Sequence, residues 1–193
     1  WRQDPLVELQ FRIMQVLERP GAMDPFDALH RLLSDQLASL PAADLRDGYL
    51  CLQNAAKFVF PVQVYYVKLF DLYREQLDAG ILYENGQLHH GVFRNVVNTA
   101  LNVNEREWSA RFISGHRRRI SPDAYAEAAY LQNMAMLYFH QGDYRKAQEY
   151  LMQSNPVDVY YKLADRSLLA RIYFELRESE ALDNLLNAFA KFV

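Results

Sequence analysis

The sequence is short of the residues that mark several protein classes. It has one cysteine, Cys51, in 193 residues, so no disulfide forms within the chain and a disulfide-stapled scaffold is excluded. Glycine and proline number seven each, too few for a collagen-like or low-complexity chain. No apolar run reaches the roughly 18 residues that span a bilayer, and no charged stretch followed by an apolar one opens the chain. We therefore expect a cytoplasmic protein without membrane insertion.

Strong charge of one sign is also missing. The formal net charge is −3, which gives no general attraction to nucleic acid or to anionic lipid. One basic run, His116-Arg117-Arg118-Arg119, stands at the expected end of a helix. Cations there complement the helix dipole and stay solvated, while a phosphate-binding patch is the alternative interpretation. We expect no nucleic-acid partner.

What the chain does contain is apolar and aromatic material in helical spacing. Hydrophobic residues make up 51%, with 13 Tyr, 11 Phe and 2 Trp, so the chain is not disordered. Capping residues precede proline at Asp4-Pro5, Asp24-Pro25 and Ser121-Pro122, a typical helix start, and Pro41 opens a further helix. Helix stops follow at Pro20-Gly21, Gly80, Asn104, Gly142 and Asn155-Pro156. The pattern predicts an all-α chain of about ten antiparallel helices of roughly 11 to 20 residues, with a two-stranded hairpin left open between Gly80 and His89.

One segment carries an internal pattern that partly repeats. It reads Leu131, Met134-Ala135, Tyr138, Gly142-Asp143-Tyr144, Ala147 and Leu151. Small Ala135 and Ala147 suit a close approach of two antiparallel helices, and Gly142 suits a left-handed residue at the end of the first. A similar pattern returns thirty-five residues later at Leu169-Ala170, Tyr173, Leu182 and Leu186. A helix pair that recurs at this period is typical of a helical repeat.

The pattern resembles that of tetratricopeptide-repeat (TPR) proteins, whose helix pairs stack into a right-handed superhelix. The resemblance implies one TPR-like domain over 1–193, with good repeats at 124–156 and 158–193 and degenerate ones at 42–80 and 90–120. A non-repetitive helical bundle with one such hairpin is the alternative. Because the chain starts at Trp1 and the last helix stops without a capping residue at Val193, we expect a fragment of a longer protein.

Catalytic signatures are missing from the sequence. A Gly-x-Ser-x-Gly elbow, a P-loop and a dinucleotide fingerprint do not occur. Cys51 lies in an apolar helix and is expected to pack as a small hydrophobe, and His89-His90 is expected to be a solvated loop pair, not a metal site. No carboxylate stands in an apolar setting that would raise its pKa. We expect no enzyme activity, no cofactor and no metal.

The TPR resemblance implies a concave groove lined by the first helix of each pair. Position then gives four sets of groove residues: Gln53, Asn54 and Lys57; Arg94, Asn95 and Asn98; Gln132, Asn133 and Met136; Ser167, Leu168 and Arg171. Asparagine can bond an extended peptide backbone, and arginine can grip a carboxylate. The predicted partner-binding residues are Lys57, Arg94, Asn98, Asn133, Met136 and Arg171. The complete carboxylate clamp of some TPR proteins is not expected, because Ala164 and Leu168 stand where its cations would be.

Two function classes follow. The first is a non-enzymatic scaffold that binds a partner peptide or helix on its concave face. The alternative is a regulatory or ligand-sensing helical region of a larger protein whose activity lies outside this segment. The apolar end near Phe189, Phe192 and Val193 also suggests self-association through the C-terminal helix.

Overall fold

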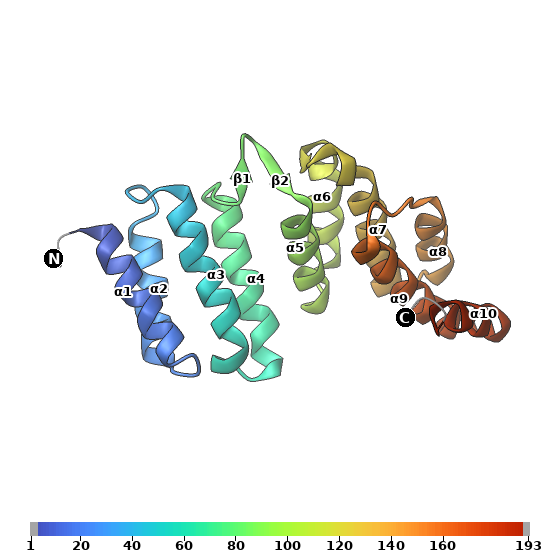
Figure 1. Ribbon diagram of the computed structural model, residues 1–193, viewed down its shortest axis with the longest axis horizontal. Helices are drawn as coiled ribbons and strands as arrows, with labels where there is room; N and C mark the ends of the chain where they lie inside the picture. The colour runs from blue at the N-terminus through green and yellow to red at the C-terminus, as the bar shows by residue number, and fades with distance from the viewer. Residues whose placement is uncertain (1–3, 191–193) are drawn as a thin grey trace. The chain divides into compact units, whose positions relative to one another are not determined.

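The structure, a computed structural model, describes residues 4–190 and is built mainly of helices (Figure 1). Ten α-helices lie in that range: α1 (Pro5–Glu18), α2 (Met23–Asp35), α3 (Ala42–Val59), α4 (Val62–Asp78), α5 (His90–Asn102), α6 (Arg106–His116), α7 (Asp123–Gln141), α8 (Tyr144–Gln153), α9 (Val159–Leu176) and α10 (Ser179–Ala190). The other elements are one 3-10 helix, η1 (Arg117–Arg119), and three short strands, β1 (Tyr83–Glu84), β2 (Gln87–His89) and β3 (Ile120–Ser121). The prediction of a mainly helical chain with ten helices is confirmed.

The chain divides into two compact units, each described by itself. The N-terminal unit (Trp1–Glu84) holds α1 to α4, and the C-terminal unit (Asn85–Val193) holds α5 to α10. Each of the four segments singled out as repeats in the sequence contains one helix pair, from α3/α4 to α9/α10. We call the earlier member of a pair the first helix and the later one the second helix.

Within each unit the pairs stack by one rule. In the N-terminal unit α3 packs against both α1 and α2, and the loops that join α1 to α4 alternate between the two ends of the helices (Figure 1). In the C-terminal unit α7 packs against both α5 and α6, and α9 packs against both α7 and α8. A first helix therefore contacts both members of the pair before it.

The core of the N-terminal unit comes from apolar residues on one face of each helix. Leu9, Leu29, Leu33 and Leu52 are fully buried there. Gly48 of α3 lies so close to the leucine of α2 that a Cβ would come 2.6 Å from the Leu33 Cδ2 atom. A glycine thus lets α2 and α3 approach each other in this unit.

In the C-terminal unit alanine, not glycine, allows the close approach of two helices, α7 and α8. Ala135 and Ala147 are fully buried in a cluster with Leu151, as the sequence predicts for helices in close contact. Gly142 ends α7 with a φ of +80°, the expected left-handed cap. Arg177 takes the same conformation after α9, with φ of +57°, although a β-carbon makes it less favourable there than glycine.

The capping residues predicted from the sequence agree with the observed helix starts only in part. Asp4 caps α1, accepting a hydrogen bond from the Leu6 N–H at 2.9 Å, with proline next. The prediction for Asp24 is wrong, because α2 begins one residue earlier, at Met23. The prediction for Ser121 is also wrong, because α7 begins at Asp123 with Pro122 directly before it, and Ser121 lies in β3 opposite His89 of β2.

The strands β2 and β3 pair in parallel and bring two buried residues together. Leu88 lies opposite Ile120 in this register, and both side chains are buried. Strands of two or three residues show no alternation that a sequence could reveal. None of the described helices combines the length and the apolarity needed to cross a bilayer.

Candidate functional site

A cleft of about 560 Å³ opens in the N-terminal unit between α2 and α4. Its apolar lining includes Phe26, Phe60 and Leu72. Phe26 is buried and meets the ring of Phe60 edge-on, with the ring centres 5.2 Å apart. The apolar part of the cleft is therefore fixed by aromatic packing.

Charged side chains line the same cleft from both sides. Four are carboxylates, Asp27 on α2 and Asp71, Glu75 and Asp78 on α4, against the two cations Lys68 and Arg74. No ion pair within the described residues involves Asp27, Asp71 or Asp78. We call this site the acidic cleft, since its carboxylates outnumber its cations even when His30 is protonated.

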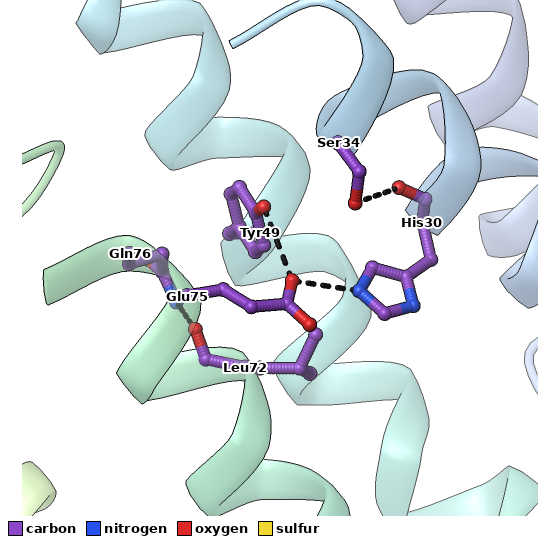
Figure 2. A network of polar contacts seen from close by, with 6 residues as sticks. All are labelled: His30, Ser34, Tyr49, Leu72, Glu75 and Gln76. Atoms are coloured by element: carbon purple, nitrogen blue, oxygen red, sulfur yellow. Dashed lines mark hydrogen bonds and ion pairs between the residues drawn. The ribbon is translucent and has the colours of Figure 1, made fainter. Parts of the chain in front are cut away.

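Glu75 joins three helices at the cleft (Figure 2). Its Oε2 atom lies 2.8 Å from Nε2 of His30 on α2 and accepts a hydrogen bond from the Tyr49 hydroxyl of α3 at 3.3 Å. The hydrogen bond to Glu75 raises the pKa of His30. The negative charge of Glu75 raises it further, and the two effects together outweigh the lowering of the pKa by burial. Burial, together with the nearby carboxylate, raises the pKa of Tyr49 to about 12. Tyr49 thus stays a neutral donor, while His30 titrates.

A second cluster of polar side chains, the ring cluster, joins three first helices of the C-terminal unit. It consists of His90 on α5, Tyr125 on α7 and Tyr161 on α9. The His90 ring stacks on Tyr125 with centres 4.1 Å apart, and its Nδ1 atom shares a 2.8 Å hydrogen bond with the Tyr161 hydroxyl. Burial raises the pKa of Tyr161 to about 12. Burial, and then His89, lowers the pKa of His90, so the imidazole is neutral at pH 7.

The ring cluster corrects the expectation of a solvated His89-His90 pair. His89 is exposed, and its Nδ1 atom accepts a hydrogen bond from the Gly91 N–H at the start of α5. His90 instead packs among tyrosines from two other helices. Only the first of the two histidines is a solvated one.

Arg94 lies one turn after His90 and is half-buried. Its guanidinium carbon is 4.3 Å from the ring centre of Tyr160, whose side chain is 52% exposed. Burial lowers the pKa of the Arg94 guanidinium, a sign of partial desolvation. Among the described residues no carboxylate forms an ion pair with it.

A buried carboxylate that the sequence did not reveal lies between α7 and α9. Asp165 is 8% exposed and accepts hydrogen bonds from the Gln132 amide at 2.7 Å and from the Ser154 hydroxyl at 2.9 Å. Burial raises the pKa of Asp165 in spite of these two bonds. The expectation that no carboxylate stands in an apolar setting is therefore wrong. Tyr161, Asp165, Leu168 and Ile172 form one buried helical stripe, and this spacing was the available signal.

The predicted groove residues on α7 lie mostly inside the unit. Asn133 is 1% exposed and donates its amide to the Ala129 carbonyl at 2.7 Å, so its side chain supports α7 and does not line an exposed groove. Met136 is half-buried against the core between α7 and α8. Leu168 of α9 is 4% exposed. These placements correct the expectation for Asn133 and Leu168, because the two side chains point into helix contacts.

The other predicted partner-binding residues reach solvent. Lys57 is exposed on α3, with its Nζ atom 4.9 Å from the ring centre of the neighbouring Phe58. Asn98 is exposed on α5, one turn after Arg94, and its backbone carbonyl accepts from the Asn102 amide at 2.8 Å. Arg171 is exposed on α9, with its guanidinium carbon 4.3 Å from the ring centre of Phe139. Of the predicted partner-binding residues in the C-terminal unit, Arg94 is thus the one that lies next to the ring cluster, one turn after His90.

The three arginines of the basic run are exposed, as expected, whereas His116 is half-buried, and two of the arginines have intramolecular partners. Arg117 donates to the Glu127 carboxylate at 3.2 Å, and Arg119 donates to the Gly86 carbonyl at 2.9 Å. Across residues 4–190 no group of three His, Cys, Asp or Glu side chains is placed to hold a metal ion. At the C-terminal end Phe189 is half-buried, while Phe192 and Val193 lie outside the described residues.

Comparisons with known proteins give no relative for this chain. Family models, curated proteins and solved structures contain no significant match to it. A function is therefore inferred from the acidic cleft, the ring cluster and the surface around Arg94.

Proposed function

We propose that this chain is a non-enzymatic protein-interaction module of TPR-like helix pairs wound in the right-handed sense of those repeats. Its partner is an extended peptide with an acidic group. The peptide binds the first-helix face, which we define as Arg94 and Asn98 of α5 and Tyr160 and Leu163 of α9. The stacking of each first helix on both members of the preceding pair supports this proposal, because such stacking lines up first helices as a continuous surface.

Arg94 is the observation that carries the proposal. A half-buried guanidinium has lost part of its hydration, and no carboxylate of the described residues replaces it. A buried charge is costly until it is paired. A partner carboxylate would supply the missing counter-ion through two parallel hydrogen bonds.

The surroundings of Arg94 supply apolar contact and rigidity. Tyr160 and Leu163 stand one turn apart on α9 and are 52% and 36% exposed, and tyrosine and arginine are the residues that most often dominate binding energy at interfaces. The Tyr160 ring holds the guanidinium from one side. The ring cluster ties α5, α7 and α9 together. The face is therefore ordered before a partner binds, and little conformational entropy is lost on binding.

Peptide selection against the full chain tests the proposal. Random peptides are displayed and selected on wild-type protein, and the dissociation constants of the enriched peptides are measured for Arg94→Gln and for Arg111→Gln. Arg111 is an exposed arginine of the same unit on the second helix α6. We expect acidic peptides to be enriched, with binding weakened about tenfold or more by Arg94→Gln and unchanged by the control. Equal affinity for both variants would reject the first-helix face as the binding site.

A further inference from the structure

We propose that the acidic cleft of the N-terminal unit binds an arginine side chain of a partner peptide. This site goes beyond the proposed function, because it lies in the other unit and takes a group of opposite charge. The inference rests on the size of the cleft, on its aromatic lining and on its charge.

The cleft has the dimensions and the lining of a side-chain pocket. Its volume of about 560 Å³ lies within the roughly 300 to 1,000 Å³ typical of sites for small ligands. Phe60 is half-buried, and the edge-on contact with buried Phe26 holds its ring in place. A guanidinium group stacks well on such a ring, because it is planar and weakly hydrated.

The charge of the cleft selects a cation. Asp27 reaches it from α2, while Asp71 and Asp78 reach it from α4. Asp71 and Asp78 are two helical turns apart and therefore lie on one face of α4. All three are exposed and have no ion-pair partner among residues 4–190. An incoming cation would thus meet carboxylates from both walls.

Arginine fits this arrangement better than lysine does. The guanidinium donates from several N–H groups in a fixed plane, so it can bond two carboxylates at once while its face rests on an aromatic ring. An ammonium group is a compact, strongly hydrated charge and gains less from the ring. Lys68 and Arg74 stand on the α4 wall, but they leave the carboxylates in excess.

The network at Glu75 holds the two walls of the cleft in register. His30 from α2 and Tyr49 from α3 both bond the same oxygen of Glu75 on α4 (Figure 2). Glu75 is thereby engaged inside the protein, while the three aspartates remain for a ligand. The aspartates can be replaced without breaking this network, which makes them the residues to test.

The experiment is an NMR titration of the full ¹⁵N-labelled chain with blocked pentapeptides Gly-Gly-X-Gly-Gly, where X is arginine, citrulline, lysine or glutamate. Citrulline has the shape of arginine without its charge. We expect the arginine peptide to shift the amide signals of α2 and α4, with the citrulline and glutamate peptides at least about tenfold weaker and lysine in between. Equal binding of citrulline, stronger binding of glutamate or lysine, or no shift with arginine would overturn the proposal.

A pair of variants checks that the aspartates act. Asp71→Asn combined with Asp78→Asn should weaken the arginine peptide about tenfold or more, whereas Asp47→Asn, at an exposed site on α3, should leave it unchanged. Thermal unfolding of both proteins shows that the exposed changes leave the fold intact. If the double variant binds arginine as the wild type does, the cleft is not the site.

Discussion

Each unit contains a hydrogen-bonded pair of polar side chains between its helices, and the two pairs differ in their exposure to solvent. In the N-terminal unit Glu75 and His30 meet at the edge of an open cleft, with side chains 37% and 33% exposed. In the C-terminal unit Gln132 and Asp165 meet inside, at 3% and 8% exposure. The aspartates beside Glu75 in this cleft are exposed and can pair with an incoming group, while the buried Asp165 is committed to the partners it has. The difference separates groups that can bind from groups that support the fold.

The histidines of the two units also differ, in this case by their partners. The pKa of His30 in the N-terminal unit is raised by its bond to Glu75. In the C-terminal unit burial lowers the pKa of His90, His116 and His140. The carboxylate partner of His30 therefore decides the sign of the shift, because a nearby carboxylate favours the charged imidazole and desolvation alone favours the neutral one.

The largest expected effect comes from the helix contact in the C-terminal unit. Ala135→Leu should destabilise that unit by about 1 to 3 kcal/mol through overpacking between α7 and α8, since Ala135 has no exposed surface. The matched control is Ala124→Leu, at an exposed position of the same helix, which should stay within about 0.5 kcal/mol. Hydrogen exchange measured unit by unit gives both values. Equal effects at the two positions would mean that α7 and α8 are not in close contact.

Next in size is the buried carboxylate. Asp165→Ala leaves the Gln132 amide and the Ser154 hydroxyl without their acceptor, which should cost about 1 to 3 kcal/mol at pH 7. Asp165→Asn keeps the shape, removes the buried charge and retains one oxygen that accepts from the Gln132 amide, while its NH2 group donates to the Ser154 oxygen. Stability should therefore stay the same or rise by up to about 1 kcal/mol. Urea unfolding of the two variants makes the comparison. A loss with asparagine as large as that with alanine would show that the ionised carboxylate with both of its acceptor oxygens is needed, against the account given for this network.

The smallest expected effect is the opposite pH dependence of the two units. His30 binds its proton more tightly when folded, so its contribution is full below about pH 6.5 and is lost as the pH rises through its raised pKa. His90, His116 and His140 bind protons less tightly when folded, so the C-terminal unit gains stability as the pH rises toward about 6.5. The His30 part should be below about 1 kcal/mol, because both partners are partly exposed.

Hydrogen exchange between pH 5 and 8 resolves the two trends. Glu75→Gln should flatten the decline of the N-terminal unit above pH 6.5 and leave the C-terminal unit as it was. A decline that persists in this variant would assign the pH dependence to other groups in the unit.

Much of the helical scaffold could be predicted from local signals. Asp4 before proline and the left-handed Gly142 mark helix ends by backbone geometry alone, and apolar spacing gives the helices between such ends. Ala135 and Ala147 were identified as contact residues because few other roles suit small residues on an apolar face. These features depend on neighbours close in the sequence.

The site residues depend on contacts far apart in the sequence, and this is why most of them could not be predicted. Glu75 and His30 are 45 positions apart, and Gln132 and Asp165 are 33 apart. The acidic cleft lies between second helices, whereas the resemblance to TPR proteins directs attention to first helices. Asn133 was misplaced because helix periodicity fixes a residue's angle around the helix but not which neighbouring helix covers it.

The central claim is that the two units bind side chains of opposite charge, and one titration tests it directly. The full labelled chain is saturated with the blocked arginine peptide and then titrated with an acidic peptide selected on the wild type. We predict shifts of α2 and α4 with the first, shifts of α5 and α9 with the second, and no displacement of one by the other. Shifts of the same unit with both peptides, or mutual displacement, would contradict the account.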